Sequence, residues 1–546
     1  ADYDSGDIRF ASVSFAVSRD YVFSVGPSIA DPYTGEILDA DIGFSQEWVR
    51  TFAGEVSTGE LGMTQQRSYG AAACSDDQHV CSGQTTAHHH QQQDARLLQS
   101  RHGCQHARLR GRNGDDHVQG DLAAAMRLLA TTSPDGRVPL SVIADGLAGV
   151  TVHEVGHTLG LRHNFKASAT IPHEKIYDGA YTSMHSSSSS VMDYIGAVIP
   201  PTQAMQKSDN TIVFPDGRTI GAYDKLAIKY GYTIVEGESA DRQHDDVAAI
   251  ASELGAKGLM FGTDDDAGIS VDPLARRYDL TDDPVAYSDD QLQIAERMRS
   301  DEAVATYQSW YPAQGFASRH KMYQSALRTA RNAAKNALYH VGGRVISHVF
   351  PGDAATPQTN MPVAPVTAAY QRKALGIVDT FLATPFYHNA ADLQKLDQQV
   401  SYFALAEMEY GLDVPDMRSA FDSTVEKYIL APLLDTEKLG RIHASEQATL
   451  RGAPVWSPKI GAHQQGGSSK VDAVGVYEVL QTVTNAVWCQ WDAAVFRLPH
   501  EWSLISTWTR GLVDLQNRTS VVSGGDANGK KSLPHISAAV ARVRLT

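Results

Sequence analysis

The amino-acid sequence predicts an α+β fold, in which a small sheet near the N-terminus precedes a mainly α-helical C-terminal region. Residues 8–26 alternate apolar and polar side chains and are rich in β-branched and aromatic residues, which is typical of strands. From about residue 301, apolar side chains instead recur at spacings of three and four, as on the buried face of a helix. A chain of 546 residues is long enough to form two or more hydrophobic cores.

The composition is that of a globular protein and argues against several classes of function. Hydrophobic residues make up 42% and charged residues 20% of the chain, and the mean hydropathy is −0.28. No apolar run reaches the roughly 18 residues of a spanning helix, so we expect no membrane span. The formal net charge is 47 − 63 = −16, whereas binding to nucleic acid or to an anionic bilayer requires concentrated Lys and Arg. We therefore expect no nucleic-acid partner.

Before residue 235, the elements can be placed in order. The apolar run 37–44 follows two turn signals and predicts a strand that joins the earlier strands in one sheet. Apolar residues at spacings of three and four predict helices over 121–131 and 141–160. A short helix is expected at 223–232, before a glycine.

The segment 64–118 differs sharply in composition from its neighbours. It is rich in Gln, His, Arg, Ser and Gly and shows no apolar periodicity, so we expect a low-complexity insertion; a reading-frame error is the second possibility. It holds three of the four cysteines, Cys74, Cys81 and Cys104, whose disulfide status stays open. These cysteines and the neighbouring histidines could form a second metal site, but a solvated loop is the simpler interpretation.

Three regions follow from these patterns. Residues 1–235 form the first, with the insertion inside it, and residues 236–300 form an acidic, turn-rich connector. Residues 301–546 form the mainly helical region. In the connector, Asp264 starts a segment similar to a calcium loop, but Ala275 stands where such a loop has Glu, so an acidic surface turn is expected.

One motif carries metal chemistry. Residues 153–163 read HEVGHTLGLRH, in which His153 and His157 lie four residues apart and therefore on one side of a helix. Two such imidazoles suit Zn²⁺, and Glu154 lies beside them as a candidate general base. His163 can supply a third nitrogen if the helix ends first, and Gly160 is placed to end it because glycine adopts left-handed backbone angles.

The rest of the predicted active-site helix suggests how it packs. Val152, Val155 and Leu159 recur at spacings of three and four on the side opposite the histidines, so we expect this stripe to bury the helix against the sheet. The strand at 36–44 is expected to line a substrate cleft and to pair with an extended peptide.

A bare HExxH can arise by chance on a helix whose histidines are structural, but the added Gly160 and His163 make this much rarer. With these residues the sequence resembles the metzincin clan of zinc peptidases, in which a methionine turn follows the zinc motif. Residues 190–194, SVMDY, look like that turn. The resemblance implies that Met192 packs under the metal as a structural Met-turn. It also implies that Tyr194 approaches the metal or the oxyanion.

The strings HEVGHTLGLRHNF, SVMDY and DPYTGEILDADI look most like those of large zinc-dependent metalloproteases from bacterial genomes. This resemblance implies a metzincin-like catalytic domain with a twisted mixed sheet and an active-site helix, followed by a long helical region. It also implies a zinc-dependent endopeptidase acting on peptide or protein substrates. Zn²⁺ on His153, His157 and His163 would activate a water molecule, and Glu154 would act as general base.

The competing hypothesis is a structural or scaffolding subunit of a larger assembly that retains the peptidase fold. In that case the helical C-terminal region would contact protein partners. The clan's usual habitat and a start at Ala1 favour secretion or an organelle lumen.

Overall fold

The computed structural model describes the fold in segments. The described residues are 7, 9–17, 23–54, 118–131, 133, 136–201, 219–234, 240–268, 271–300, 303, 305, 316–347, 362–384, 417–458, 472–488, 499–519 and 533–545. The predicted insertion, with Cys74, Cys81 and Cys104, falls outside them up to residue 117.

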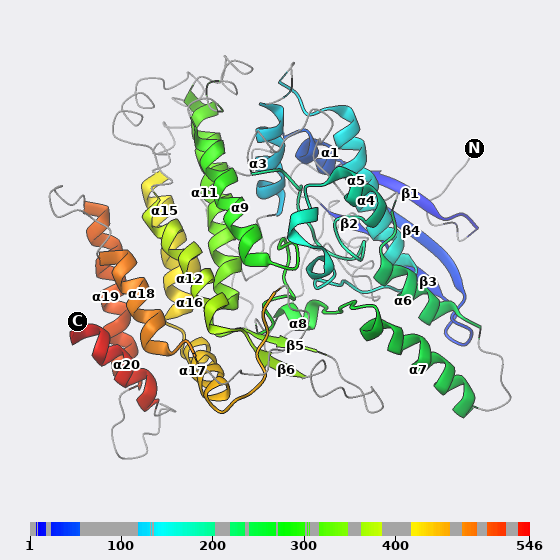
Figure 1. The fold of residues 1–546 in the computed structure, drawn as a ribbon. Coiled ribbons are helices and arrows are strands. Elements are labelled where there is room, and N and C mark those ends of the chain that lie inside the picture. The colour runs from blue at the N-terminus through cyan, green and yellow to red at the C-terminus, as the bar shows by residue number, and fades with distance from the viewer. Residues whose placement is uncertain are drawn as a thin grey trace, which may run out of the picture. The chain divides into compact units, whose positions relative to one another are not determined.

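The chain divides into two compact units. Residues 1–126 and 138–162 make up the first unit, and residues 127–137 and 163–546 make up the second. Figure 1 shows the elements of both. The helices and small mixed sheets are compatible with the predicted α+β class, and the predicted region boundaries at 235 and 300 stay predictions.

The first unit contains a four-stranded mixed sheet. Its strands are β1 (Ser12–Ala16), β2 (Ser24–Val25), β3 (Ser28–Ala30) and β4 (Ile37–Ser45). β1 runs parallel to β4, while β2 and β3 run antiparallel to it, so β4 lies at the centre. The early strands thus share one sheet, as predicted. Stacking of Phe15 on the buried Phe44, with ring centroids 5.5 Å apart, adds a side-chain contact to the β1–β4 pair.

The expected pairing of β4 with a peptide substrate is wrong for the second half of the strand. Residues 41–45 of β4 pair with β1 on one side, and Gly43 and Phe44 pair with β2 on the other. Because neighbouring strands occupy both edges there, no backbone edge is open to an added peptide.

Three helices accompany this sheet: α1 (Glu47–Phe52), α3 (Val118–Ala130), whose end from Arg127 belongs to the second unit, and α4 (Leu140–Thr158). α4 contacts α1, β2 and β4. A Cβ added to Gly146 would lie 2.6 Å from Cδ1 of Phe52, so α1 approaches α4 closely only because that position is glycine.

The predicted buried stripe of α4 is wrong. Val155 is 40% exposed and Leu159 is 38% exposed. The buried positions lie instead on the face that includes Gly146, His153 and Gly156. The lack of a side chain at Gly146 lets the ring of Phe52 come close to this face of the helix.

The second unit is built largely of helices and one hairpin of β5 (Arg344–Ile346) and β6 (Val363–Pro365). Its helical elements in chain order are η3 (Ser168–Thr170), η4 (His173–Lys175), α5 (Gly179–His185), α6 (Ala222–Tyr232), α7 (Ala240–Ala256), α8 (Asp264–Gly268), α9 (Pro284–Arg299), α11 (Phe316–His340), α12 (Ala368–Ala383), α15 (Met417–Val425), η7 (Glu426–Leu430), α16 (Ala431–Leu433), α17 (Thr436–Leu450), α18 (Val476–Trp488), α19 (Pro499–Thr519) and α20 (Pro534–Leu545).

Helix α11 lies at the centre of one layer of this unit. It packs against α9 and α12, as Figure 1 shows for the green helices. Ala326, Ala330, Ala334 and Ala337 are fully buried at spacings of three and four, and these small side chains let the helices approach closely.

The segment 236–300, expected to be turn-rich, contains α7, α8 and α9. The pair Asp283-Pro284, a common turn signal, is the start of α9. The side chain of Asp283 accepts a hydrogen bond from the backbone N–H of Ala286, and Pro284 occupies the first turn, where its missing N–H costs nothing. The same residues are common in turns and at helix starts, which is why the sequence predicted turns where a helix begins.

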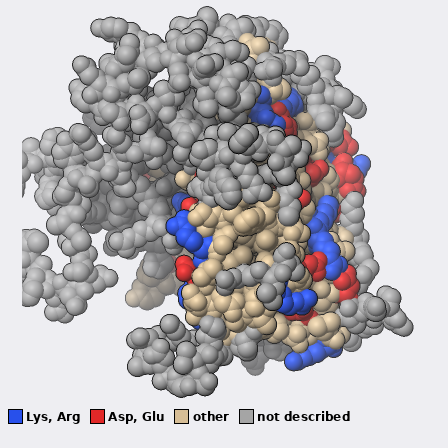
Figure 2. All heavy atoms as spheres, turned by 90° about the vertical axis from the view of Figure 1, so that its left-hand side faces the viewer, with Lys and Arg blue, Asp and Glu red and all other residues tan. Residues whose placement is uncertain are grey.

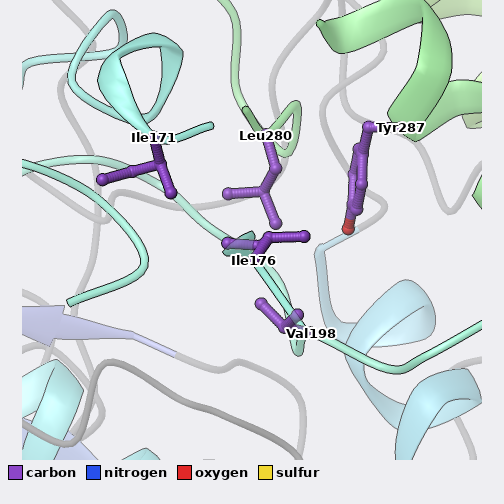
Figure 3. Packing of buried hydrophobic residues seen from close by; sticks show 5 residues of the cluster. All are labelled: Ile171, Ile176, Val198, Leu280 and Tyr287. Atoms are coloured by element: carbon purple, nitrogen blue, oxygen red, sulfur yellow. The ribbon is translucent and has the colours of Figure 1, made fainter. Parts of the chain in front are cut away.

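A compact hydrophobic cluster connects the chain after His163 to α9. Ile171, Ile176, Val198, Leu280 and Tyr287 are all buried and point toward one another (Figure 3). This cluster anchors the loops that follow the zinc motif.

The charged side chains are mixed in sign on one face of the molecule (Figure 2), and the described helices are not those of a membrane span. On the face drawn in Figure 2, Lys and Arg side chains are interspersed with Asp and Glu around a broad uncharged area. Among the described residues, no helix is both long and apolar enough to cross a bilayer.

Candidate metal centre

Helix α4 places the first two histidines. His153 and His157 lie one turn apart, with ring centroids 4.7 Å apart and planes at 87°. His153 is 5% exposed. Nδ1 of His157 lies 3.0 Å from the carbonyl oxygen of Leu161, which suits donation by Nδ1–H and leaves Nε2 as the metal donor.

The end of α4 brings in the third histidine. Gly160 has φ +85°, its N–H donates to the carbonyl of His157 at 2.9 Å, and the N–H of Leu161 donates to the carbonyl of Gly156 at 3.0 Å. These two bonds form a Schellman motif, which ends the helix sharply. His163 follows three residues later and is 3% exposed.

The three histidines form a buried cluster. One potential ligand atom from each of His153, His157 and His163 lies within 4.8 Å of the others. Nitrogens bound about 2.0–2.1 Å from one Zn²⁺ are at most about 4.2 Å apart, so small side-chain rotations would close the set around an ion. Three neutral imidazoles are a donor set that zinc prefers. The residues present therefore fit the ion.

Glu154 lies in the same turn of α4 and is fully buried. Burial raises the pKa of its carboxyl to about 7, an effect that the nearby Ser24 side chain partly opposes. A divalent cation nearby would lower this pKa again. The backbone of Gly26 lies against this turn, because a Cβ there would be 2.9 Å from the carbonyl carbon of Glu154. The carboxyl therefore sits on a tightly packed stretch of backbone.

Tyr194 lies beside the third histidine. Its hydroxyl is 2.8 Å from Nε2 of His163, and the two rings meet edge to face with centroids 4.6 Å apart. Met192, two residues earlier, is completely buried. Its carbonyl accepts a hydrogen bond of 3.0 Å from the N–H of Asn164, so the turn that contains Met192 adjoins the residue after His163.

The serine-rich tract before this turn forms a loop, as its composition indicates, and Ser186 to Ser190 are all buried. Asp224 of α6 binds the C-terminal end of this tract. Its carboxylate accepts hydrogen bonds from the Ser190 hydroxyl at 2.6 Å and from the Val191 N–H at 2.8 Å. A buried carboxylate needs such donors, and small serine side chains supply them without filling the space.

A second buried carboxylate, Asp193, belongs to the turn itself. It accepts hydrogen bonds from the Ser168 N–H at 2.8 Å and from the Ser188 hydroxyl at 3.2 Å. Burial nevertheless raises the pKa of Asp193 to about 7. The turn is therefore fixed to the chain after His163 by a group that is protonated below neutral pH.

This raised pKa predicts how stability depends on pH. Asp193 keeps its proton up to about pH 7 in the folded protein but loses it near about pH 4 when unfolded, so its stabilising contribution is full below about pH 4 and is lost as the pH rises toward 7. Asp193→Asn should reduce this decline by an amount on the order of 1–4 kcal/mol in urea unfolding between pH 4 and 7. Asp289→Asn, at an exposed position of α9, is the matched control. Equal pH slopes in all three proteins would contradict the prediction.

The structure adds two residues that sequence reasoning did not assign to the site, Asp264 and Arg277. Oδ2 of Asp264 lies 2.8 Å from Nδ1 of His163, and Nη2 of Arg277 donates to Oδ1 of Asp264 at 3.2 Å. Partial burial raises the pKa of Asp264, but the bond from His163 and the charge of Arg277 outweigh it and lower this pKa to about 2. The expected acidic surface turn at this position is wrong: Asp264 begins α8 and contacts His163.

Comparison with known proteins gives one family. A family model described as Met-zincin matches residues 136–494, which is more than half of the chain and includes the three histidines. No curated protein and no solved structure matches the chain significantly.

Proposed function

The chain belongs to the Met-zincin family, and from this premise we propose that it is a zinc-dependent endopeptidase. The family and the cluster of three histidines support a zinc metallopeptidase type of function. The observation that carries the proposal is the buried convergence of His153, His157 and His163 with Glu154 in the same helix. A bound Zn²⁺ would polarise the scissile carbonyl and lower the pKa of the attacking water.

Glu154 is the proposed general base. Its carboxylate would accept a proton from the attacking water and then give it to the leaving amine. Burial raises the pKa of this carboxyl above its usual range, which makes its carboxylate a better proton acceptor for this role. Burial in the helix keeps its position fixed and excludes bulk water.

Tyr194 and Met192 have supporting roles in this proposal. The Tyr194 hydroxyl, held near Nε2 of His163, would donate a hydrogen bond to the oxyanion that forms on the substrate. Met192 would form the floor of the site as part of a Met-turn, which is supported by its complete burial and by the backbone link to Asn164.

We also propose a substrate class, a relationship, a role for the C-terminal region and a location for the protein. The substrate would be a peptide or protein, and the relationship would be closest to the large bacterial-type metalloproteases that carry HEVGHTLGLRHNF. Residues 301–546 would form a mainly helical region that contacts protein partners, and the protein would be secreted or lie in an organelle lumen. The scaffolding alternative is not favoured, because the three histidines and Glu154 are all present and buried together.

Zinc removal tests the proposed function. The purified protein should contain one Zn²⁺ per chain by metal analysis and should cleave a denatured protein mixture. A chelator should abolish cleavage, because the three imidazoles alone cannot activate water, and added Zn²⁺ should restore it. A chelator-treated sample repleted with Mg²⁺ is the control, since Mg²⁺ prefers oxygen ligands. Full cleavage after zinc removal would contradict the proposal.

A further inference from the structure

The third histidine is held on two sides by residues distant in sequence. Nδ1 of His163 lies 2.8 Å from Oδ2 of Asp264, which is 101 residues away, and Nε2 lies 2.8 Å from the Tyr194 hydroxyl. A carboxylate can only accept, so Asp264 requires the proton of the neutral ring to be on Nδ1. The lone pair of His163 is then on Nε2, the nitrogen on the side of Tyr194.

Asp264 is itself fixed by a cation. Its other carboxylate oxygen, Oδ1, accepts from Nη2 of Arg277 at 3.2 Å. The guanidinium of Arg277 lies 5.0 Å from the ring centre of Phe165 and 5.6 Å from that of Tyr194. Each oxygen of Asp264 thus has its own partner, and Arg277 also packs on the rings that border His163.

The same segment fixes the tyrosine. The N–H of Tyr278 donates to the carbonyl of Tyr194 at 2.8 Å. Phe165 stacks on His163 at 5.1 Å between centroids and meets Tyr194 edge to face at 5.1 Å. His163 therefore has its ring plane set by packing and its tautomer set by a carboxylate.

We propose that Asp264, supported by Arg277, is a positioning residue for the third metal ligand: it holds the His163 ring in the tautomer and orientation that present Nε2 to the ion. This inference rests on the proposed function. Carboxylates that accept from the far nitrogen of a ligating histidine make the ligand more basic and fix its direction, and their loss costs about 10–100-fold in metal affinity.

The experiment uses the full-length protein with Asp264→Ala and Asp264→Asn, and Asp289→Asn as the matched control. Asn keeps an acceptor oxygen but loses the charge, whereas Ala loses both. Asp289 is an exposed acid on α9, so its replacement makes the same charge change away from His163. Three quantities are measured: the Zn²⁺ dissociation constant by competition with a chromophoric chelator, the visible spectrum of the Co²⁺-substituted protein, and the thermal midpoint of the metal-free protein.

Asp264→Ala should raise the dissociation constant about 10–100-fold and alter the Co²⁺ bands, and Asp264→Asn should have a smaller effect in the same direction. Asp289→Asn should match the wild type. If Asp264→Ala does not fold, the zinc affinity and the Co²⁺ bands of Asp264→Asn test the inference. Wild-type zinc affinity and Co²⁺ bands in the Asp264 variants would overturn the inference, and so would a lowered thermal midpoint with unchanged affinity. A wild-type protein that binds no zinc would contradict the proposed function as well. If the wild type binds zinc and cleaves peptides, the results for the Asp264 variants bear on the inference alone.

Discussion

Glu154→Gln is expected to lower kcat/KM for peptide hydrolysis by about 10²–10⁴-fold while zinc stays bound. Glutamine has nearly the same size, so the buried site of Glu154 can accept it, but an amide cannot take a proton from water. The histidines are unchanged, so metal analysis should still find one ion per chain. The measurement is the rate of cleavage of a quenched fluorescent peptide at saturating zinc.

The matched control for this variant is Glu437→Gln, an exposed position in α17. It should cleave the peptide at the wild-type rate. Full activity of the Glu154 variant would reject the proposed base and leave the histidine cluster as a metal site with other chemistry. Loss of zinc from the variant would show instead that the carboxyl is needed to hold the ion.

Gly26→Ala is expected to destabilise the first unit by about 1–3 kcal/mol and to lower kcat/KM by about 10²-fold. A Cβ at this position would overlap the backbone of α4, lying 2.9 Å from the carbonyl carbon and 3.1 Å from the Cα of Glu154. Backbone atoms cannot rotate out of the way, so the strand end or the helix must move. Either movement displaces the proposed base. Urea unfolding and peptide hydrolysis measure the two effects.

Gly43→Ala is the control for this substitution. Gly43 lies in β4 of the same sheet, and its added Cβ would be 3.3 Å from a methyl group of Val25, the end of a side chain. A small adjustment of that side chain relieves the contact, so stability and activity should change little. Equal effects of the two alanines would show that the Gly26 contact does not position Glu154.

Local patterns predicted the elements that surround the zinc motif. The strand expected at 37–44 is β4, and the helices expected at 121–131, 141–160 and 223–232 are α3, α4 and α6, with no end shifted by more than three residues. These elements are visible in sequence because periodicity and end signals act within one turn or one strand. The convergence of the three histidines could also be predicted from sequence, since all three lie within an eleven-residue segment of the chain.

Other features depend on contacts that local patterns do not carry. The buried face of α4 was misassigned because it includes the glycines Gly146 and Gly156, which apolar periodicity scores as neutral, and Gly146 packs closely against Phe52. The Asp-Pro pair before α9 fits a turn and a helix start equally well. Asp264 reaches His163 across 101 residues, and a single acidic residue in an acidic stretch has no feature that distinguishes it.

The long reach from His163 to Asp264 also bears on biosynthesis. The ribosome releases the chain from its N-terminus, so the HExxH helix emerges well before the residue that borders its last histidine. A nascent polypeptide that stops short of residue 264 has the zinc motif but lacks this carboxylate, and one that stops short of residue 277 also lacks the guanidinium that steadies it. The surroundings of His163 can therefore be completed only after Asp264 and Arg277 have been translated. An unfinished chain that lacks these two residues cannot hold the third histidine in the same way.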